Sequence, residues 1–124
     1  MRKMKVIFLD IDGVLNYANT PNPRKFPYVV DPQLLRSLKN VVAATGAHMV
    51  LSSTWRYDPA GLFSARRCGV PFESVLPDRP GQARREEILE WLGEHPEATR
   101  FAVIETKTTN SMTCHYFSRQ LGRV

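Results

Sequence analysis

The sequence predicts an α/β fold, a three-layer Rossmann-like arrangement in which a parallel β-sheet carries helices on both faces. Three short apolar segments, each of strand length, alternate along the chain with segments of helical periodicity. Such continuous apolar runs are typical of strands buried on both sides, and alternation with helices favours right-handed crossovers and parallel pairing. The 124 residues, 43% of them apolar, suffice for one core, so we expect a single domain over 1–124.

The first predicted strand covers residues 5–9 and ends at a pair of acids. Residues 16–30 then read as an irregular loop or a short hairpin, because prolines and asparagines interrupt any periodicity. A helix follows, with Asp31 as its N-cap, Pro32 in its first turn and Gly46 at its end.

The second half repeats this alternation. A second strand is predicted at residues 48–51, and a short helix begins at Asp58-Pro59 and stops at Gly69. Residues 70–78 read as extended chain or loop. The remaining predicted elements are an amphipathic helix at 84–93, with Ile88, Leu89, Trp91 and Leu92 on its apolar side, a third strand at 101–104, and a terminal helix near Tyr116 to Leu121.

Composition excludes several classes of protein. No apolar run approaches the ~20 residues that a membrane-spanning helix needs, and the N-terminal apolar stretch is too short for a signal peptide. Two cysteines are too few for a disulfide framework, so we expect free thiols and a cytoplasmic protein. The net charge of +5 is dispersed along the chain, which permits a polyanionic partner such as nucleic acid without requiring one.

Polar residues follow each of the three predicted strands. Asp10 and Asp12 follow the first, Ser52 and Arg56 the second, and Glu105 the third. The carboxyl ends of parallel strands meet at one edge of the sheet, where open α/β sheets bind ligands. Two carboxylates so close raise each other's pKa unless a cation lies between them. An acid pair, a hydroxyl, a cation and a third acid suit Mg²⁺-assisted phosphoryl transfer, with one carboxylate attacking phosphorus.

These segments resemble the motifs of the haloacid-dehalogenase-like (HAD) superfamily of phosphohydrolases, in particular a small capless branch similar to HAD domains of RNA-repair proteins. The resemblance covers roughly residues 4–105 and leaves 106–124 atypical. Its four motifs are Leu-Asp-Ile-Asp-Gly-Val-Leu at 9–15, Val-Leu-Ser-Ser at 50–53, a basic helix start within 81–88, and the strand at 101–105 that ends in an acid.

The resemblance implies a role for each residue that follows a strand. Asp10 is expected as the nucleophile that forms an aspartyl-phosphate, and Asp12 as the general acid/base. Ser52 is expected to bind a phosphoryl oxygen, and Arg84, in preference to Arg85, to stabilise the nucleophile and the phosphate.

The same resemblance implies the ligand contacts. Mg²⁺ is expected on Asp10, on the backbone carbonyl of Asp12 and on Glu105. Gly13, Ser53 and Arg56 are expected to contact the substrate. For Ser53 the alternative is local hydrogen bonding, and for Arg56 it is a surface charge.

Two features bear on substrate and activity. The segments between the motifs are too short for a cap domain, and a site without a cap admits large substrates, so a macromolecular or polynucleotide phosphate is expected alongside small phosphomonoesters.

Glu105 is followed by Lys107 and by no second carboxylate within 106–110, although the superfamily's fourth motif carries paired acids. A catalytically weakened module that binds phosphate or nucleic acid is therefore an alternative function, and a purely structural or interaction protein is a third.

Overall fold

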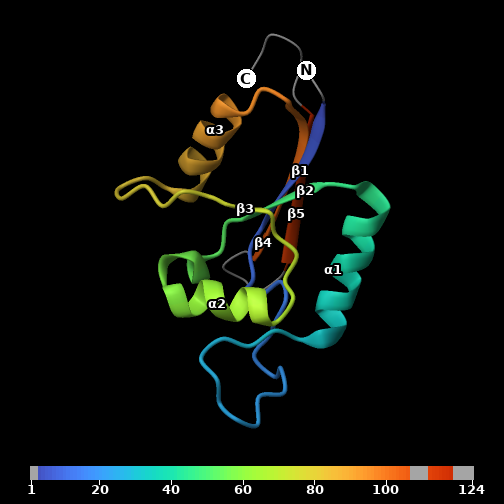
Figure 1. The fold of residues 1–124 in the computed structure, drawn as a ribbon, viewed down its shortest axis with the longest axis vertical. Helices are drawn as coiled ribbons and strands as arrows, with labels where there is room; N and C mark the ends of the chain where they lie inside the picture. Colours follow the sequence, from blue (N-terminus) through green and yellow to red (C-terminus); the bar gives the residue numbers. More distant parts are fainter. Residues whose placement is uncertain (1–2, 107–111, 119–124) are drawn as a thin grey trace.

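The computed structural model describes residues 3–106 and the backbone of residues 112–118 (Figure 1). One five-stranded sheet has the order β3-β2-β1-β4-β5, in which the first four strands are parallel and β5 runs antiparallel to β4. The strands are β1 (Met4–Leu9), β2 (His48–Leu51), β3 (Ser74–Val75), β4 (Ala98–Thr106) and β5 (Met112–Ser118). The helices are α1 (Pro32–Thr45), the 3-10 helix η1 (Thr54–Tyr57), α2 (Pro59–Arg67) and α3 (Arg84–Glu94).

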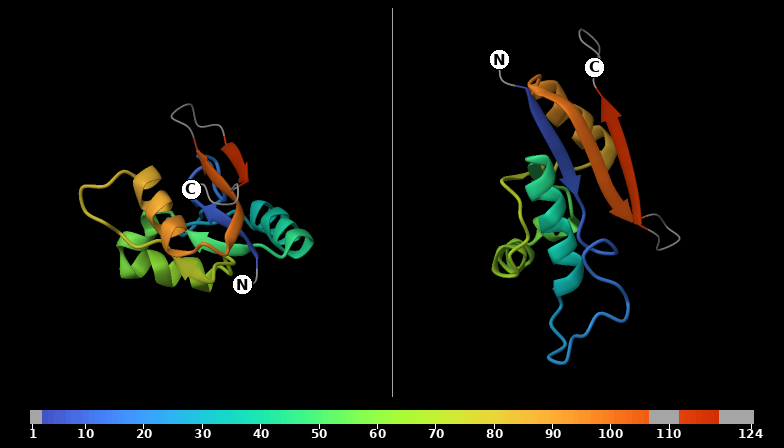
Figure 2. Two further views of the ribbon diagram at one scale, coloured as in Figure 1. Left: turned by 90° about the horizontal axis from the view of Figure 1, so that it is seen from above. Right: turned by 90° about the vertical axis from the view of Figure 1, so that its right-hand side faces the viewer.

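Helices cover both faces of the sheet, which confirms the predicted three-layer arrangement. Alternate residues of β1 belong to different cores: Ile7 and Leu9 join the cluster that includes residues of α1 and α2, whereas Phe8 packs with residues of α3. The ring of Phe8 meets Trp91 of α3 edge-on, with 5.4 Å between ring centroids. Figure 2 shows α1 and α3 on opposite sides of the strands.

The predicted helix starts are confirmed. The Asp31 side chain accepts hydrogen bonds from the backbone N–H groups of Gln33 and Leu34 at the start of α1. Asp58 caps α2 in the same way through the N–H of Ala60. Gly46 ends α1 with φ +65°, a left-handed conformation that favours glycine.

Two predictions need correction, the terminal helix and the place of Leu89. The expected terminal helix near Tyr116 is wrong for residues 116–118, which lie in β5, while 119–121 lie outside the described residues. The segment is rich in strand-forming residues, and pairing satisfies the outer edge of β4, where Arg100 to Thr106 would otherwise lack partners. Within residues 70–78, which were expected as extended chain or loop, Ser74–Val75 form the short strand β3 beside β2. Leu89 is 47% exposed, outside the apolar stripe of α3.

The carboxyl edge of the sheet carries no inserted domain in the part of the chain described. Between β1 and α1, residues 10–31 form turns and loops without a helix or strand. Among residues 3–106 and 112–118, no helix combines the length and apolar character needed to cross a bilayer.

A buried ion pair joins η1, which follows β2, to α3. Nη2 of Arg56 lies 2.7 Å from Oε1 of Glu87, and their side chains are 1% and 2% exposed. The other guanidinium N–H groups of Arg56 donate to the carbonyls of Ser52, Ser53 and Leu76. The predicted contact of Arg56 with substrate is therefore corrected, because these donors bind the protein interior.

Ser53 also has a structural place. Its side chain is fully buried, and its Oγ accepts the N–H of Trp55, which caps η1. This bond agrees with the alternative of local hydrogen bonding and corrects the expectation that Ser53 contacts substrate.

We predict that Glu87→Gln lowers the free energy of unfolding by about 3–5 kcal/mol, because it leaves the buried Arg56 guanidinium without a counter-charge. Urea denaturation measures the loss. The control is Glu86→Gln, which removes the same charge from the same helix turn at an exposed position and should change stability by less than about 0.5 kcal/mol. Equal effects of the two substitutions would contradict the role given to the buried pair.

Candidate functional site

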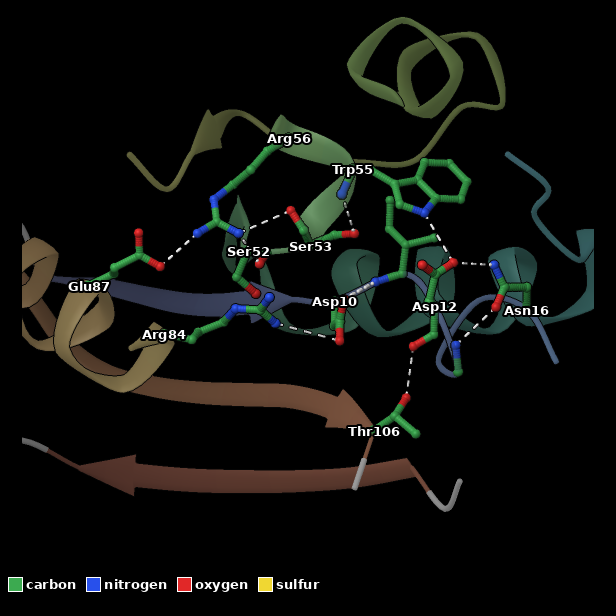
Figure 3. A network of polar contacts seen from close by, with 12 residues as sticks. Asp10, Asp12, Asn16, Ser52, Ser53, Trp55, Arg56, Arg84, Glu87 and Thr106 are labelled. Atoms are coloured by element: carbon green, nitrogen blue, oxygen red, sulfur yellow. Dashed lines mark hydrogen bonds and ion pairs between the residues drawn. The ribbon is translucent and has the colours of Figure 1, made fainter. Parts of the chain in front are cut away.

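Strand register brings three of the predicted residues to one place. Leu9 is paired with Leu51 of β2 and with Ile104 of β4, so Asp10, Ser52 and Glu105 occupy the next position on three neighbouring strands. The N–H of Asp10 donates to the Ile104 carbonyl at 3.0 Å, which continues the pairing beyond the end of β1. Because side chains alternate along a strand, all three are expected on the face that α3 covers. Figure 3 shows Asp10, Ser52 and Arg84 near one another at this edge.

Asp10 is partly buried at the centre of this edge. Its Oδ1 accepts the N–H of Ile11 at 2.9 Å, and its Oδ2 lies 3.6 Å from Nη1 of Arg84. Burial raises the pKa of Asp10 above its ordinary value of 3.8, and the negative charges of Asp12 and Glu105 add to that rise. The Arg84 guanidinium and the Ile11 N–H lower the pKa of Asp10, but they do not cancel the rise, and the pKa remains above its ordinary value.

Arg84 brings positive charge to Asp10 from the first turn of α3. The helix begins after Ala83 with no side-chain cap, so its first N–H groups and the positive end of its dipole remain available to an anion. Nε of Arg84 is buried and has no hydrogen-bond partner among the described residues. Arg85 is exposed, and the ion pair to Asp10 comes from Arg84. The arrangement suits a bound anion.

The Asp12 side chain is held by donors from two other parts of the chain. Its Oδ1 accepts hydrogen bonds from Nδ2 of Asn16 at 2.9 Å and from Nε1 of Trp55 at 3.0 Å (Figure 3). Its backbone carbonyl, one of the expected metal ligands, accepts the Oγ1–H of Thr106 at 2.8 Å. A carbonyl oxygen has two lone pairs, so this bond leaves one for a further partner.

Gly13 shapes the turn and is not placed to bind substrate through its N–H. That N–H donates to Oδ1 of Asn16 at 2.9 Å, so it is not available for substrate, and a substrate contact by another atom of Gly13 stays a prediction. Its φ of +81° favours glycine, and a Cβ here would collide with the side chain of Thr106. The turn after Asp12 therefore packs directly on the end of β4.

Sequence reasoning missed four residues that shape the site: Asn16, Trp55, Glu87 and Thr106. One signal was available for Glu87, which falls at helical spacing with Ile88, Trp91 and Leu92 on the apolar stripe of α3. A charge on such a stripe indicates a buried partner. The hydrogen bonds of Trp55 and Thr106 join residues far apart in the chain, and no local pattern predicts them.

The donor set fits Mg²⁺ by chemical type. Asp10 and Glu105 supply carboxylates, and Asp12 supplies a backbone carbonyl; Mg²⁺ usually binds one or two carboxylates together with water and substrate phosphate. Among residues 3–106, whose side chains are described, no group of three or more His, Cys, Asp or Glu side chains could hold a metal ion. The pKa of Asp10 is raised first by burial and further by the negative charges of Asp12 and Glu105, and a bound cation would favour its ionised form.

No curated protein and no solved structure matches the chain. A family model does match, that of the HAD domain in Swiss Army Knife RNA repair proteins, over residues 6–120. The match runs past Glu105, where the motif resemblance ended, and includes β5. It agrees with the observed three-layer fold and places the chain in a superfamily of hydrolases and phosphatases. The chain belongs to the family of HAD domains in Swiss Army Knife RNA repair proteins.

Proposed function

We propose that this domain is a Mg²⁺-dependent phosphomonoesterase that acts through an aspartyl-phosphate on Asp10. The observation that carries the proposal is the position of this carboxylate: partly buried at the end of the central strand, 3.6 Å from Arg84. Ser52 and Glu105 follow the neighbouring strands in the same register. Family membership supports a phosphohydrolase-type activity.

The Asp10 contacts suit a nucleophile. The bond from the Ile11 N–H fixes the carboxylate through Oδ1, and 3.6 Å is too long for a hydrogen bond between Oδ2 and Arg84. Oδ2 of Asp10 thus lies near the positive charge of Arg84 without forming a hydrogen bond to it. In the proposed first step a carboxylate oxygen of Asp10 bonds to phosphorus as the bond to the leaving oxygen breaks. Arg84 and the Ser52 hydroxyl stabilise the phosphoryl oxygens.

Asp12 would handle the protons of both steps. Its carboxylic acid donates a proton to the leaving alcohol in the first step, and its carboxylate takes one from the water that hydrolyses the aspartyl-phosphate in the second. Phosphate leaves, and both acids return to their starting states. Mg²⁺, held by Asp10, Glu105 and the Asp12 carbonyl, would neutralise the phosphate charge when bound.

The proposed substrate is a phosphate monoester on a large molecule, such as a polynucleotide end. No inserted domain interrupts residues 10–31, so the carboxyl edge lacks the cap that would enclose a small metabolite. The net charge of +5 favours a polyanion, and the family is named for RNA repair proteins.

A phosphate-binding module without turnover is the second candidate. Thr106 already occupies one lone pair of the Asp12 carbonyl, and no second acid follows Glu105 within residues 106–110. This candidate predicts phosphate binding at Arg84 with no phosphate release in any divalent metal.

Replacing the nucleophile tests the proposal directly. We predict that Asp10→Asn lowers kcat/KM for p-nitrophenyl phosphate with Mg²⁺ by at least about 10³-fold, because the amide cannot form the acyl phosphate. Phosphate release is measured at equal protein concentration. The control is the exposed Asp78→Asn, which should stay within about twofold of wild type. Full activity in Asp10→Asn would rule out this nucleophile.

The same substitution has a predicted effect on stability without metal. Burial raises the pKa of Asp10, so its charged form destabilises the fold at pH values above the ordinary 3.8 and has no such effect below it. Asp10→Asn should therefore raise the melting temperature in EDTA at pH 7, with the difference shrinking as the pH falls toward 3.8.

Adding Mg²⁺ should reverse this order. Wild type gains stability through its Asp10 ligand, whereas Asp10→Asn gains little. Calorimetry with and without Mg²⁺ measures both effects. A variant that melts below wild type in EDTA would contradict the unfavourable charge at Asp10, and equal gains from Mg²⁺ would contradict its role as a ligand.

A further inference from the structure

The indole of Trp55 forms a hydrogen bond with the side chain of Asp12. Nε1 of Trp55 donates to Oδ1 of Asp12 at 3.0 Å, across 43 residues of sequence. Trp55 is only 3% exposed, whereas Asp12 is exposed, so the contact joins a core side chain to a carboxylate at the edge of the site (Figure 3).

Trp55 is itself firmly held. Its backbone N–H donates to Oγ of Ser53, and its ring meets the ring of Tyr28 with 4.9 Å between centroids at 66°. The Tyr28 hydroxyl donates to Oδ2 of Asp58 at 2.6 Å, the residue that caps α2. The backbone of Gly61 lies so close to Trp55 that a Cβ at Gly61 would collide with it. The indole N–H is therefore a donor in a fixed position, and it determines where Oδ1 of Asp12 lies.

Asn16 donates to the same oxygen of Asp12. Its Nδ2 lies 2.9 Å from Oδ1 and also 2.9 Å from the Val29 carbonyl, while its Oδ1 accepts the Gly13 N–H. Within the described residues, both hydrogen bonds to the Asp12 carboxylate thus end on Oδ1. Two N–H donors on one oxygen leave Oδ2 to carry the transferable proton.

We propose that Trp55 and Asn16 are positioning residues that orient Asp12 so that Oδ2 protonates the leaving oxygen. This inference rests on the proposed function. A purely structural role of Trp55 depends on the packing of its ring and not on its N–H, whereas the orienting role requires the N–H. The distinction makes the inference testable, because a poor leaving group needs the proton and a good one does not.

The test compares two substrates. We expect Trp55→Phe to lower kcat for an alkyl phosphate, such as a nucleoside 5′-monophosphate, by about 10–100-fold, and kcat for p-nitrophenyl phosphate by less than about threefold.

Asn16→Asp, which keeps an acceptor for Gly13 but turns a donor to Asp12 into a second carboxylate, should show the same selective loss. It tests the contact independently if Trp55→Phe does not fold. The control is Trp91→Phe, which replaces a core tryptophan stacked on His95 and should show no selectivity between substrates.

Failure of this inference is distinct from failure of the proposed function. If wild type hydrolyses neither phosphate, the proposed function falls and takes this inference with it. If wild type hydrolyses both and Asp10→Asn neither, the proposed function stands. Equal losses on the two substrates, or no loss, in Trp55→Phe and Asn16→Asp would then overturn the positioning role alone.

Discussion

The register of β1 between β2 and β4 is the constraint on which the site depends. Pairing of Leu9 with Leu51 and Ile104 places Asp10 beside Ser52 and Glu105 at the same edge of the sheet. A slip of one residue in either pairing would turn the polar groups to opposite faces, because side chains alternate along a strand. Apolar residues on both faces of β1 hold this register, since both cores would lose buried surface in a slipped sheet.

The buried ion pair of Arg56 and Glu87 fixes the position of α3 relative to the strand ends. It joins η1, which follows β2, to the first turn of α3, the turn that also carries Arg84. Truncating one member of such a pair leaves an uncompensated charge in the interior, so the pair constrains where α3 can begin. Arg84 can then meet Asp10 from the helix N-terminus, where a cation gains nothing from the helix dipole. The electrostatic disadvantage is consistent with a site organised for an anion rather than for stability.

Local patterns predicted most of the fold. Apolar runs predicted the central strands, and Asp-Pro pairs predicted the starts of α1 and α2, because strand burial and helix capping depend on neighbouring residues. The antiparallel β5 was missed, since its pairing with β4 depends on the unpaired edge of that strand and not on helical spacing. Arg56 was expected at the substrate because it closely follows Ser52 in the sequence. Nearness in sequence does not reveal which way a side chain points.

Predictions about the site divide in the same way. The ends of the strands could be predicted from the sequence and their register could not, and the structure brings Asp10, Ser52, Arg84 and Glu105 to one edge. The orientation of Asp12 was not accessible, because it depends on Trp55 and on a hydrogen bond that spans 43 residues. Long-range polar contacts of this kind leave no periodic signal.

Trapping the covalent intermediate shows whether Asp10 is the nucleophile. The protein is mixed with Mg²⁺ and a phosphate monoester, quenched, reduced with borohydride and digested, and the peptide that contains Asp10 is analysed by mass spectrometry. Reduction converts an aspartyl-phosphate to homoserine, so the account predicts homoserine at position 10 only when substrate and metal are both present. Release of phosphate without homoserine at position 10, or with homoserine at another aspartate, would contradict it.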